Sequence, residues 1–189
     1  VRYLLDHDHR VTVFDNLSTG HRDAVGSAEL IEADLADVPA IEQTLRANSY
    51  DGVMHFASFI QVGESVVDPA KYYQNNVTNT QNLMDAMVAT HTNHLVFSST
   101  AAIFGDPEYI PIDEAHPKAP INPYGRSKWM VEQMLDDYDR AYGLRSVRLR
   151  YFNAAGAHPS GALGERHDPE THLIPLILQA ASGQRPGIK

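Results

Sequence analysis

The sequence predicts an α/β fold built on a doubly wound parallel sheet, and three observations lead to this prediction. Short buried apolar runs alternate with amphipathic helical stretches along all 189 residues. Such alternation is typical of β-α-β units, whose strands are parallel and whose helices cover both faces of the sheet. The composition, 43% hydrophobic and 21% charged, is that of a globular protein. No repeat, linker or low-complexity tract interrupts the pattern.

The expected strands are short apolar runs bounded by turn-forming residues. They cover residues 11–15, 29–32, 52–57, 95–98 and 147–150. The expected helices are recognised by side-chain caps and by apolar residues three and four apart. They cover residues 1–6, 38–48, 69–91, 123–142 and 172–181. The clearest start is Asn122 before Pro123, because asparagine caps a first turn and proline suits the first helical position. Gly143 ends that helix, and Asp37 caps the helix over 38–48.

Composition excludes several classes of function. The chain has 15 Lys+Arg and 24 Asp+Glu, a net charge of −9, whereas a nucleic-acid partner requires a basic surface. It has no cysteine, which excludes a disulfide scaffold and a thiolate metal site and suits a reducing compartment. The longest apolar run is too short to span a bilayer. We therefore expect a cytoplasmic protein without a secretory leader and without nucleic-acid or membrane partners.

The strongest candidate for chemistry is the stretch from Tyr124 to Lys128. Spacing i, i+4 places the phenol and the ammonium on one helix face, about 5–6 Å apart at Cβ. A nearby cation favours the phenolate, so we expect a lowered pKa for Tyr124 and proton exchange near neutral pH. Thr100 follows the strand over 95–98, where α/β sheets place ligand-contacting groups. The alternative is that Thr100 only caps the end of that strand.

Two acids end neighbouring strands. In dinucleotide-binding folds an acid at the position of Asp15 binds the adenosine ribose, and its charge favours NAD over NADP. The alternative is a plain turn aspartate. Asp34 is placed to accept a hydrogen bond from an adenine amino group. The ten histidines offer no convincing metal site, since neither His7 with His9 nor His91 with His94 has a third ligand at suitable spacing.

The motifs follow one another in an order that resembles the UDP-glucose 4-epimerases, which are extended short-chain dehydrogenase/reductases of the NAD-dependent epimerase/dehydratase group. The resemblance is carried by Val13–Leu17, His55–Ala57, Val62–Ser65, Tyr72–Val77, Phe97–Thr100, Tyr124–Lys128 and Arg150–Pro159, with Gly161, Gly164–Glu165 and His172–Pro175. The whole superfamily shares Tyr-x-x-x-Lys, whereas the run from Arg150 is more specific. The resemblance implies a Rossmann-like fold.

The resemblance also implies a role for individual residues. The catalytic residues would be Thr100, Tyr124 and Lys128. The NAD-binding residues would be Asp15, Asn16, Asp34, Leu35, Phe56, Ala57, Asn75, Tyr124, Lys128 and Phe152. The residues that bind a UDP-sugar would be Thr100, Tyr124, Asn153, His172 and Leu173. Tyr124 would take the proton of the sugar 4-OH while hydride moves from C4 to NAD and returns to the other face, through a 4-keto sugar.

Three alternatives follow from the resemblance. The expected substrates are UDP-glucose and UDP-galactose. One alternative is another UDP-sugar pair, of N-acetylhexosamines, uronates or pentoses. The other is a relative that binds a nucleotide without catalysing a reaction. A dehydratase is disfavoured, because Ala101 and Ala102 follow Thr100 where dehydratases carry an acidic pair. The family's usual homodimer contact uses the helices over 69–91 and 123–142.

The family's fold begins with a strand and a Gly-rich phosphate loop, and this sequence contains neither. We therefore expect residues 1–189 to be a partial NAD-binding domain that lacks the first strand and the Gly-rich loop. It would include the start of the nucleotide-sugar-binding region, with the rest of the substrate domain absent. A polypeptide of this extent is expected to bind NAD poorly and to be inactive.

Overall fold

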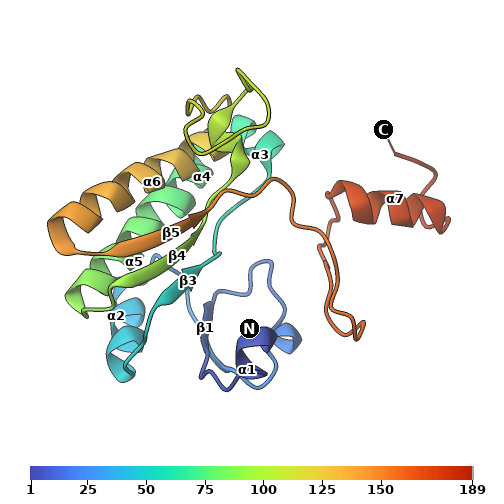
Figure 1. The fold of residues 1–189 in the computed structure, drawn as a ribbon. Coiled ribbons are helices and arrows are strands. Elements are labelled where there is room, and N and C mark those ends of the chain that lie inside the picture. Colours follow the sequence, from blue (N-terminus) through green and yellow to red (C-terminus); the bar gives the residue numbers. More distant parts are fainter. Residues whose placement is uncertain (189) are drawn as a thin grey trace. The chain divides into compact units, whose positions relative to one another are not determined.

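The computed structural model describes residues 1–188, which form two compact units. The central unit is the continuous stretch Ala33–Phe152. The split unit combines Val1–Glu32 with the chain from Asn153 onward. Each unit holds a parallel sheet of its own, so the predicted α/β class with parallel strands is confirmed (Figure 1).

The sheet of the central unit has three parallel strands in the order β3-β4-β5. They are β3 (Val53–His55), β4 (His94–Ser98) and β5 (Arg145–Leu149). His55 pairs with Phe97, and Ser98 pairs with Leu149. This register brings the residues that follow all three strands to one edge of the sheet, which is where parallel sheets carry their functional groups.

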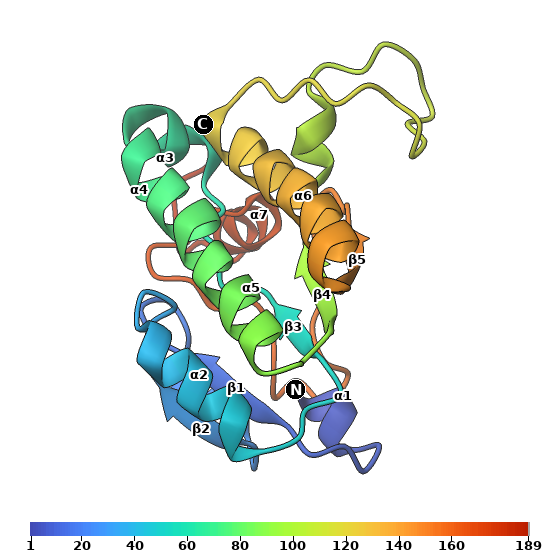
Figure 2. The ribbon, with the colours of Figure 1, turned by 90° about the vertical axis from the view of Figure 1, so that its left-hand side faces the viewer.

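Helices of the central unit lie against one face of this sheet. The helices are α2 (Val38–Ala47), α3 (Val62–Val67), α4 (Pro69–Tyr73), α5 (Asn79–Ala89) and α6 (Pro123–Tyr142). Figure 1 shows α5 and α6 on the same side of the strands. On the other side Met54 and Val147 are exposed by 50% and 59%. The turned view of Figure 2 again shows α5 and α6 together on one side of the strands.

The caps predicted from the sequence form as expected. Asn122 Oδ1 accepts a hydrogen bond from the Gly125 amide at 2.8 Å, and Pro123 takes the first turn of α6. Gly143 ends this helix with a φ of +71°, a left-handed conformation that glycine adopts without strain. Asp37 Oδ1 likewise accepts from the amide of Ala40 at 3.1 Å.

The helix predicted over 69–91 is regular only at its two ends. Between α4 and α5 lies a π-helical turn, Gln74–Thr78. It turns Asn76 into the interior, where its side-chain amide accepts from the Phe59 amide at 2.9 Å and donates to the Phe59 carbonyl at 3.0 Å. Asn76 Nδ2 also lies 3.2 Å from Ser127 Oγ. A uniform helical period does not predict this turn, because one extra residue shifts the buried face.

The core of the central unit lies between α5, α6 and β4. Its apolar side chains include Leu83, Met84, Met87, Leu95, Phe97, Val131 and Leu135. A 3₁₀ helix, Ala101–Phe104, follows β4 and places Ile103 and Phe104 in a small adjoining cluster. This packing makes the end of β4 a rigid base for the residues after it.

The split unit contains two strands and short helices. They are α1 (Arg2–Leu5), β1 (Thr12–Asp15), a 3₁₀ helix (Arg22–Val25), β2 (Glu29–Glu32) and α7 (Leu173–Ala181). β1 and β2 are parallel, with Asp15 opposite Glu32. No described residue of this unit is buried. Among the helices of residues 1–188, none has both the length and the apolar character needed to cross a bilayer.

Candidate active site

Lys128 lies in the interior beside the end of β4. Its side chain is 1% exposed, and Nζ donates to the carbonyl of Ser98 at 2.8 Å. The ammonium also lies 4.9 Å from the centre of the Phe97 ring. Burial disfavours the charged form and lowers the pKa of Lys128 to about 7. The lysine is therefore held by a backbone carbonyl and is poised between its charged and neutral forms.

The hydroxyls of Tyr124 and Thr100 meet in a side-chain hydrogen bond. Thr100 Oγ1 also accepts from the amide of Ala102 at 3.1 Å and so caps the 3₁₀ helix that follows β4. The alternative interpretation of Thr100, a cap after the strand, is thus observed, whereas its predicted contact with a ligand remains a prediction. The structure brings together the three residues predicted to be catalytic.

The expected lowering of the Tyr124 pKa is wrong for this structure. Burial raises the pKa of Tyr124, the Thr100 hydrogen bond lowers it, and the neighbouring Tyr151 raises it, with a net upward direction. The prediction assumed that the Lys128 ammonium faces the phenol. Instead, Lys128 donates to the Ser98 carbonyl, so the loss of hydration outweighs the cation.

Gly125 sets how closely α6 approaches the 3₁₀ helix. A Cβ at this position would lie 2.7 Å from the carbonyl oxygen of Ala102 and 3.1 Å from Cβ of Pro120. The glycine between Tyr124 and Lys128 therefore allows backbone to approach backbone, which brings Tyr124 within reach of Thr100.

Two further residues at this site were not singled out from the sequence. Tyr151 Oη contacts Ser98 Oγ, and Glu132 is fully buried beneath the loop after β4. Helical spacing indicates Glu132, because it lies four residues after Lys128 on the same face. Tyr151 has no such signal, since only the fold brings the end of β5 beside the end of β4.

Three residues predicted to bind the cofactor, Asp34, Leu35 and Asn75, make hydrogen bonds within the central unit. Asp34 Oδ1 accepts from the amide of Ala36 at 2.8 Å, and the Leu35 carbonyl accepts from Asn82 Nδ2 at 3.0 Å. Asn75 donates to Asn76 Oδ1 at 2.9 Å. These bonds fix the backbone around each residue, and the predicted cofactor roles remain predictions.

The segment after β3 has the chemistry that a dinucleotide needs. Phe56 is 52% exposed, Ala57 is exposed, and Ser58 Oγ is buried without a hydrogen-bond partner among the described residues. Phe152, after β5, is 71% exposed. An apolar surface with an unsatisfied hydroxyl beside it suits a planar ring that carries polar groups. The residues of this unit therefore fit the predicted cofactor by type.

The predicted ribose residues lie in a tight turn of the split unit. Asp15 Oδ1 accepts from the amide of Leu17 at 2.7 Å, and Asn16 Oδ1 accepts from that of Ser18 at 3.0 Å. The loop returns so closely that a Cβ on Gly20 would lie 3.2 Å from the Asp15 carboxylate. The alternative interpretation, a turn aspartate, describes Asp15 as it stands. Asn153, at the start of the second stretch of this unit, is exposed.

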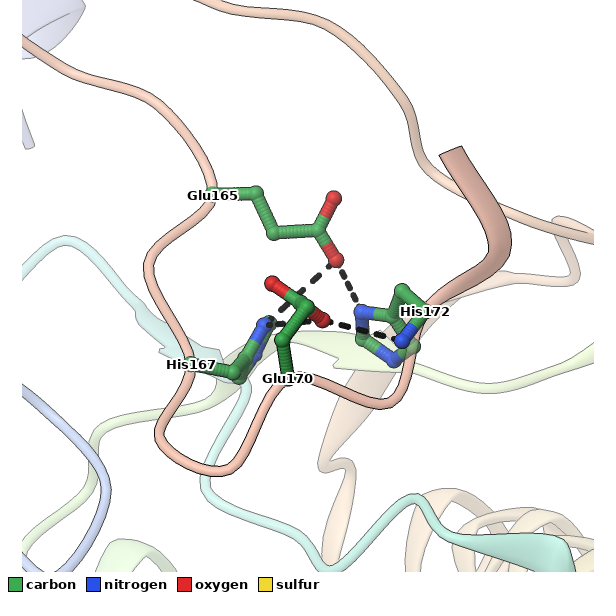
Figure 3. Close-up of side chains that lie close together, drawn as sticks. All are labelled: Glu165, His167, Glu170 and His172. Atoms are coloured by element: carbon green, nitrogen blue, oxygen red, sulfur yellow. Dashed lines mark hydrogen bonds and ion pairs between the residues drawn. The ribbon is translucent and has the colours of Figure 1, made fainter. Parts of the chain in front are cut away.

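His172 belongs to a cluster that the sequence interpretation missed (Figure 3). Ligand atoms of Glu165, His167, Glu170 and His172 lie within 4.8 Å of one another. His172 contacts Glu165, and Glu170 Oε1 accepts from the backbone amide of His172 at 2.9 Å. The E-x-H-x-x-E-x-H spacing was its signal. These contacts pair the four groups with one another and order the loop before α7, whose first residue, Leu173, is 63% exposed. The prediction of no metal stays untested.

A tyrosine, a lysine and a threonine grouped after a strand of a parallel sheet is the arrangement of the extended short-chain dehydrogenase/reductases. The model of the NAD dependent epimerase/dehydratase family matches residues 1–189, and the chain belongs to that family.

Two comparisons refine this assignment. The chain is 50% identical over 186 residues to a UDP-glucose 4-epimerase of Rhizobium leguminosarum bv. trifolii, covering 98% of this chain and 57% of that protein. It is 49% identical to the UDP-glucose 4-epimerase of Brucella ovis, solved in complex with NAD, with a TM-score of 0.97, covering 99% of this chain and 57% of the other.

A third comparison concerns the sugar. The UDP-Glc/GlcNAc 4-epimerase of Campylobacter jejuni is 39% identical, with a TM-score of 0.82, over 97% of this chain and 58% of that one. The chain thus spans a little over half the length of the relatives it matches. The expected Rossmann-like fold is confirmed by these structures.

Proposed function

We propose that the protein is an NAD-dependent UDP-glucose 4-epimerase, an isomerase that interconverts UDP-glucose and UDP-galactose by inverting C4. One observation carries the proposal: Tyr124 shares a hydrogen bond with Thr100, and four residues further along the same helix the buried Lys128 binds the carbonyl of Ser98. A nucleotide-binding protein without activity has no need for this group. The identity to named 4-epimerases favours epimerisation over other reactions of the family. This activity would place the protein in galactose metabolism, in the cytoplasm.

The catalytic steps follow from the three side chains. Tyr124 Oη exchanges a proton with the sugar 4-oxygen, and the Thr100 hydroxyl donates to the Tyr124 oxygen and so stabilises the phenolate. Burial lowers the pKa of Lys128 to about 7, so near neutral pH the lysine takes up or releases a proton while the Ser98 carbonyl holds it at the end of β4. NAD, when bound, supplies the reversible hydride acceptor for C4, and the sugar passes through a 4-keto form.

The proposal assigns a role in binding NAD to individual residues. Asp15 and Asn16 would bind the adenosine ribose, and Asp34 and Leu35 the adenine. The remaining residues would line the dinucleotide; they are Phe56, Ala57, Asn75, Tyr124, Lys128 and Phe152. Asn153, His172 and Leu173 would contact the UDP-sugar.

A second candidate is epimerisation of another UDP-sugar. The similarity to the Campylobacter jejuni enzyme, whose name includes both UDP-Glc and UDP-GlcNAc, favours testing N-acetylated sugars. We also propose a homodimer through the helices over 69–91 and 123–142, of which the second exposes Met130 by 42%. Light scattering of the purified protein tests the dimer.

The experiment is an epimerisation assay with the purified full-length protein and no added reductant. We expect UDP-galactose to convert to UDP-glucose and Tyr124→Phe to reduce kcat by about 10²–10⁴-fold, because proton transfer loses its group. Parallel assays with UDP-N-acetylgalactosamine distinguish the second candidate. Near-normal turnover by Tyr124→Phe would refute the proposed mechanism.

A further inference from the structure

A fully buried carboxylate lies beneath the reactive hydroxyls. Glu132 is 0% exposed and lies eight residues after Tyr124 and four after Lys128 on α6. At this spacing the three side chains form one stripe along the helix. Burial of an ionised carboxylate is unfavourable unless its oxygens are paired. Both oxygens of Glu132 accept hydrogen bonds, so the carboxylate is fixed in one position.

The first partner of Glu132 is Arg150, which follows β5. Arg150 Nε lies 3.0 Å from Oε1 of Glu132, and Nη2 lies 2.5 Å from Oε2, so the guanidinium binds the carboxylate in a bidentate arrangement. Next to Arg150, the carbonyl of Tyr151 accepts from the amide of Ala101 at 3.0 Å. The ion pair therefore connects α6 to the end of β5, and the bond from Ala101 to Tyr151 connects the end of β5 to the loop after β4.

The second partner is Ser99, which is 1% exposed and whose hydroxyl donates a hydrogen bond to Glu132 Oε1 at 2.5 Å. Ser99 lies between Ser98 and Thr100. Each of these three successive residues is bound by one member of the helix stripe: Ser98 by Lys128, Ser99 by Glu132, and Thr100 by Tyr124. The loop after β4 is thereby held to α6 at three consecutive points.

We propose that Glu132 is a positioning residue that, with Arg150, fixes Ser99 and thereby sets where Thr100 meets Tyr124. Glu132 touches neither the reacting hydroxyl of Tyr124 nor that of Thr100, and it acts through the backbone between Ser99 and Thr100. A shift of 1 Å in a catalytic group reduces rates by about 10²-fold, so the bond from Ser99 has a measurable effect. This inference rests on the proposed epimerase function.

The test compares three variants of the full-length protein: Ser99→Ala, Glu132→Gln and Asp136→Asn. Asp136 is the matched control, because it lies one turn further along the same stripe and binds Arg148 at 2.8 Å with a side chain 47% exposed. We expect Ser99→Ala and Glu132→Gln to lower kcat by about tenfold or more with KM within about twofold of wild type. Asp136→Asn leaves both constants unchanged.

A second measurement does not depend on turnover. The titration of Tyr124 is followed by tyrosinate absorbance, as the difference between each variant and the same variant carrying Tyr124→Phe. Because the Thr100 hydrogen bond lowers the pKa of Tyr124, a displaced Thr100 moves that pKa upward in Ser99→Ala. The titratable groups that interact with the Tyr124 phenol are Tyr72 on α4 and Tyr151 after β5, and Lys128 lies four residues further along α6; all three are retained in these variants.

Ser99→Ala keeps the Glu132–Arg150 ion pair, so it tests position even where Glu132→Gln fails to fold. A Ser99→Ala protein with the kcat and the Tyr124 titration of the wild type would overturn the inference. If the wild type does not epimerise UDP-sugars, the proposed function fails, while the titration still tests whether Ser99 positions Thr100.

Discussion

Two arginine–carboxylate pairs make two-pronged hydrogen bonds in contrasting surroundings. In the split unit, Arg166 binds Asp23 at 2.6 and 3.1 Å, with both side chains more than half exposed. In the central unit, Arg150 binds Glu132, whose carboxylate is inaccessible to water. Water screens the first pair, so it contributes little to stability, whereas loss of one partner of the second leaves a buried charge. Burial, rather than hydrogen-bond geometry, decides what each pair contributes.

The contrast extends to the units that contain these pairs. The split unit has no buried residue among those described. Its ion pairs, such as Asp23 with Arg166 and Glu165 with His167, join side chains that are partly or largely exposed. The central unit buries polar side chains such as His55, Lys128 and Glu132 and gives each a partner. Buried polar groups in a network hold one geometry, which is what catalysis requires.

The largest expected effect comes from breaking the buried pair. Arg150→Ala should lower the free energy of unfolding by about 3–5 kcal/mol, because the fully buried Glu132 carboxylate loses its cation. Asp23→Ala is the control and should leave the denaturation midpoint unchanged. Urea unfolding of the full-length protein measures both, and equal effects of the two replacements would remove the contrast between the units.

A smaller effect is expected from an added methyl group. Gly125→Ala should cost about 1–3 kcal/mol, because the new Cβ meets the backbone of Ala102 and α6 must move away. It should also weaken epimerisation by separating Tyr124 from Thr100. At Gly164, in the split unit, an added Cβ would lie 3.5 Å from Cβ of Ala157, which is an ordinary contact distance. Gly164→Ala should therefore leave the free energy of unfolding unchanged. Comparable losses at both glycines would contradict the close approach of α6.

The smallest expected effect is a pH dependence from the buried histidine. His55 Nε2 lies 2.8 Å from Thr80 Oγ1, and burial lowers the pKa of His55 to about 3. The unfolded state then binds more protons between pH 3 and 6.5, so this contribution is complete above pH 6.5 and is lost as the pH falls. Between pH 7 and 5.5 the free energy of unfolding should fall by about 1 kcal/mol through His55.

The control for this prediction is a replacement in each unit. His55→Gln should remove that part of the pH dependence, and His9→Gln, at an exposed position of the split unit, should retain it. Unfolding curves at several pH values provide the measurement. A pH dependence that is the same in wild type and His55→Gln would show that His55 is not held neutral by burial.

Local rules predicted most elements of the fold. Caps at Asp37 and Asn122 and the left-handed Gly143 depend only on neighbouring residues, and the structure confirms all three. The π-helical turn at Gln74–Thr78 was missed because it exists to bring Asn76 to the distant Phe59 and Ser127. Helix α3 was missed as well, since a helix of six residues has too short a period to recognise.

In the candidate site, too, spacing along the sequence predicted some residues, whereas others depend on contacts between distant segments. Spacing within one helix identified Tyr124 and Lys128, and the same spacing leads to Glu132. The direction of the Tyr124 pKa was predicted wrongly, because spacing along α6 does not reveal that Lys128 donates to a carbonyl of β4. The Ser99 hydroxyl and Tyr151 become part of the site only when β4 and β5 lie side by side.

Asn76 has a consequence for the segment that follows β3. Its side-chain amide meets the N–H and C=O of Phe59 as a peptide of a neighbouring strand does. The Asn76 side chain thus forms the same pair of hydrogen bonds that a neighbouring β-strand would form with Phe59. An aspartate at this position could not replace it, because a carboxylate has no N–H to donate. The chain leaving β3 is therefore anchored at Phe59, and this bond places the exposed Phe56 and Ala57 between the end of β3 and a fixed point.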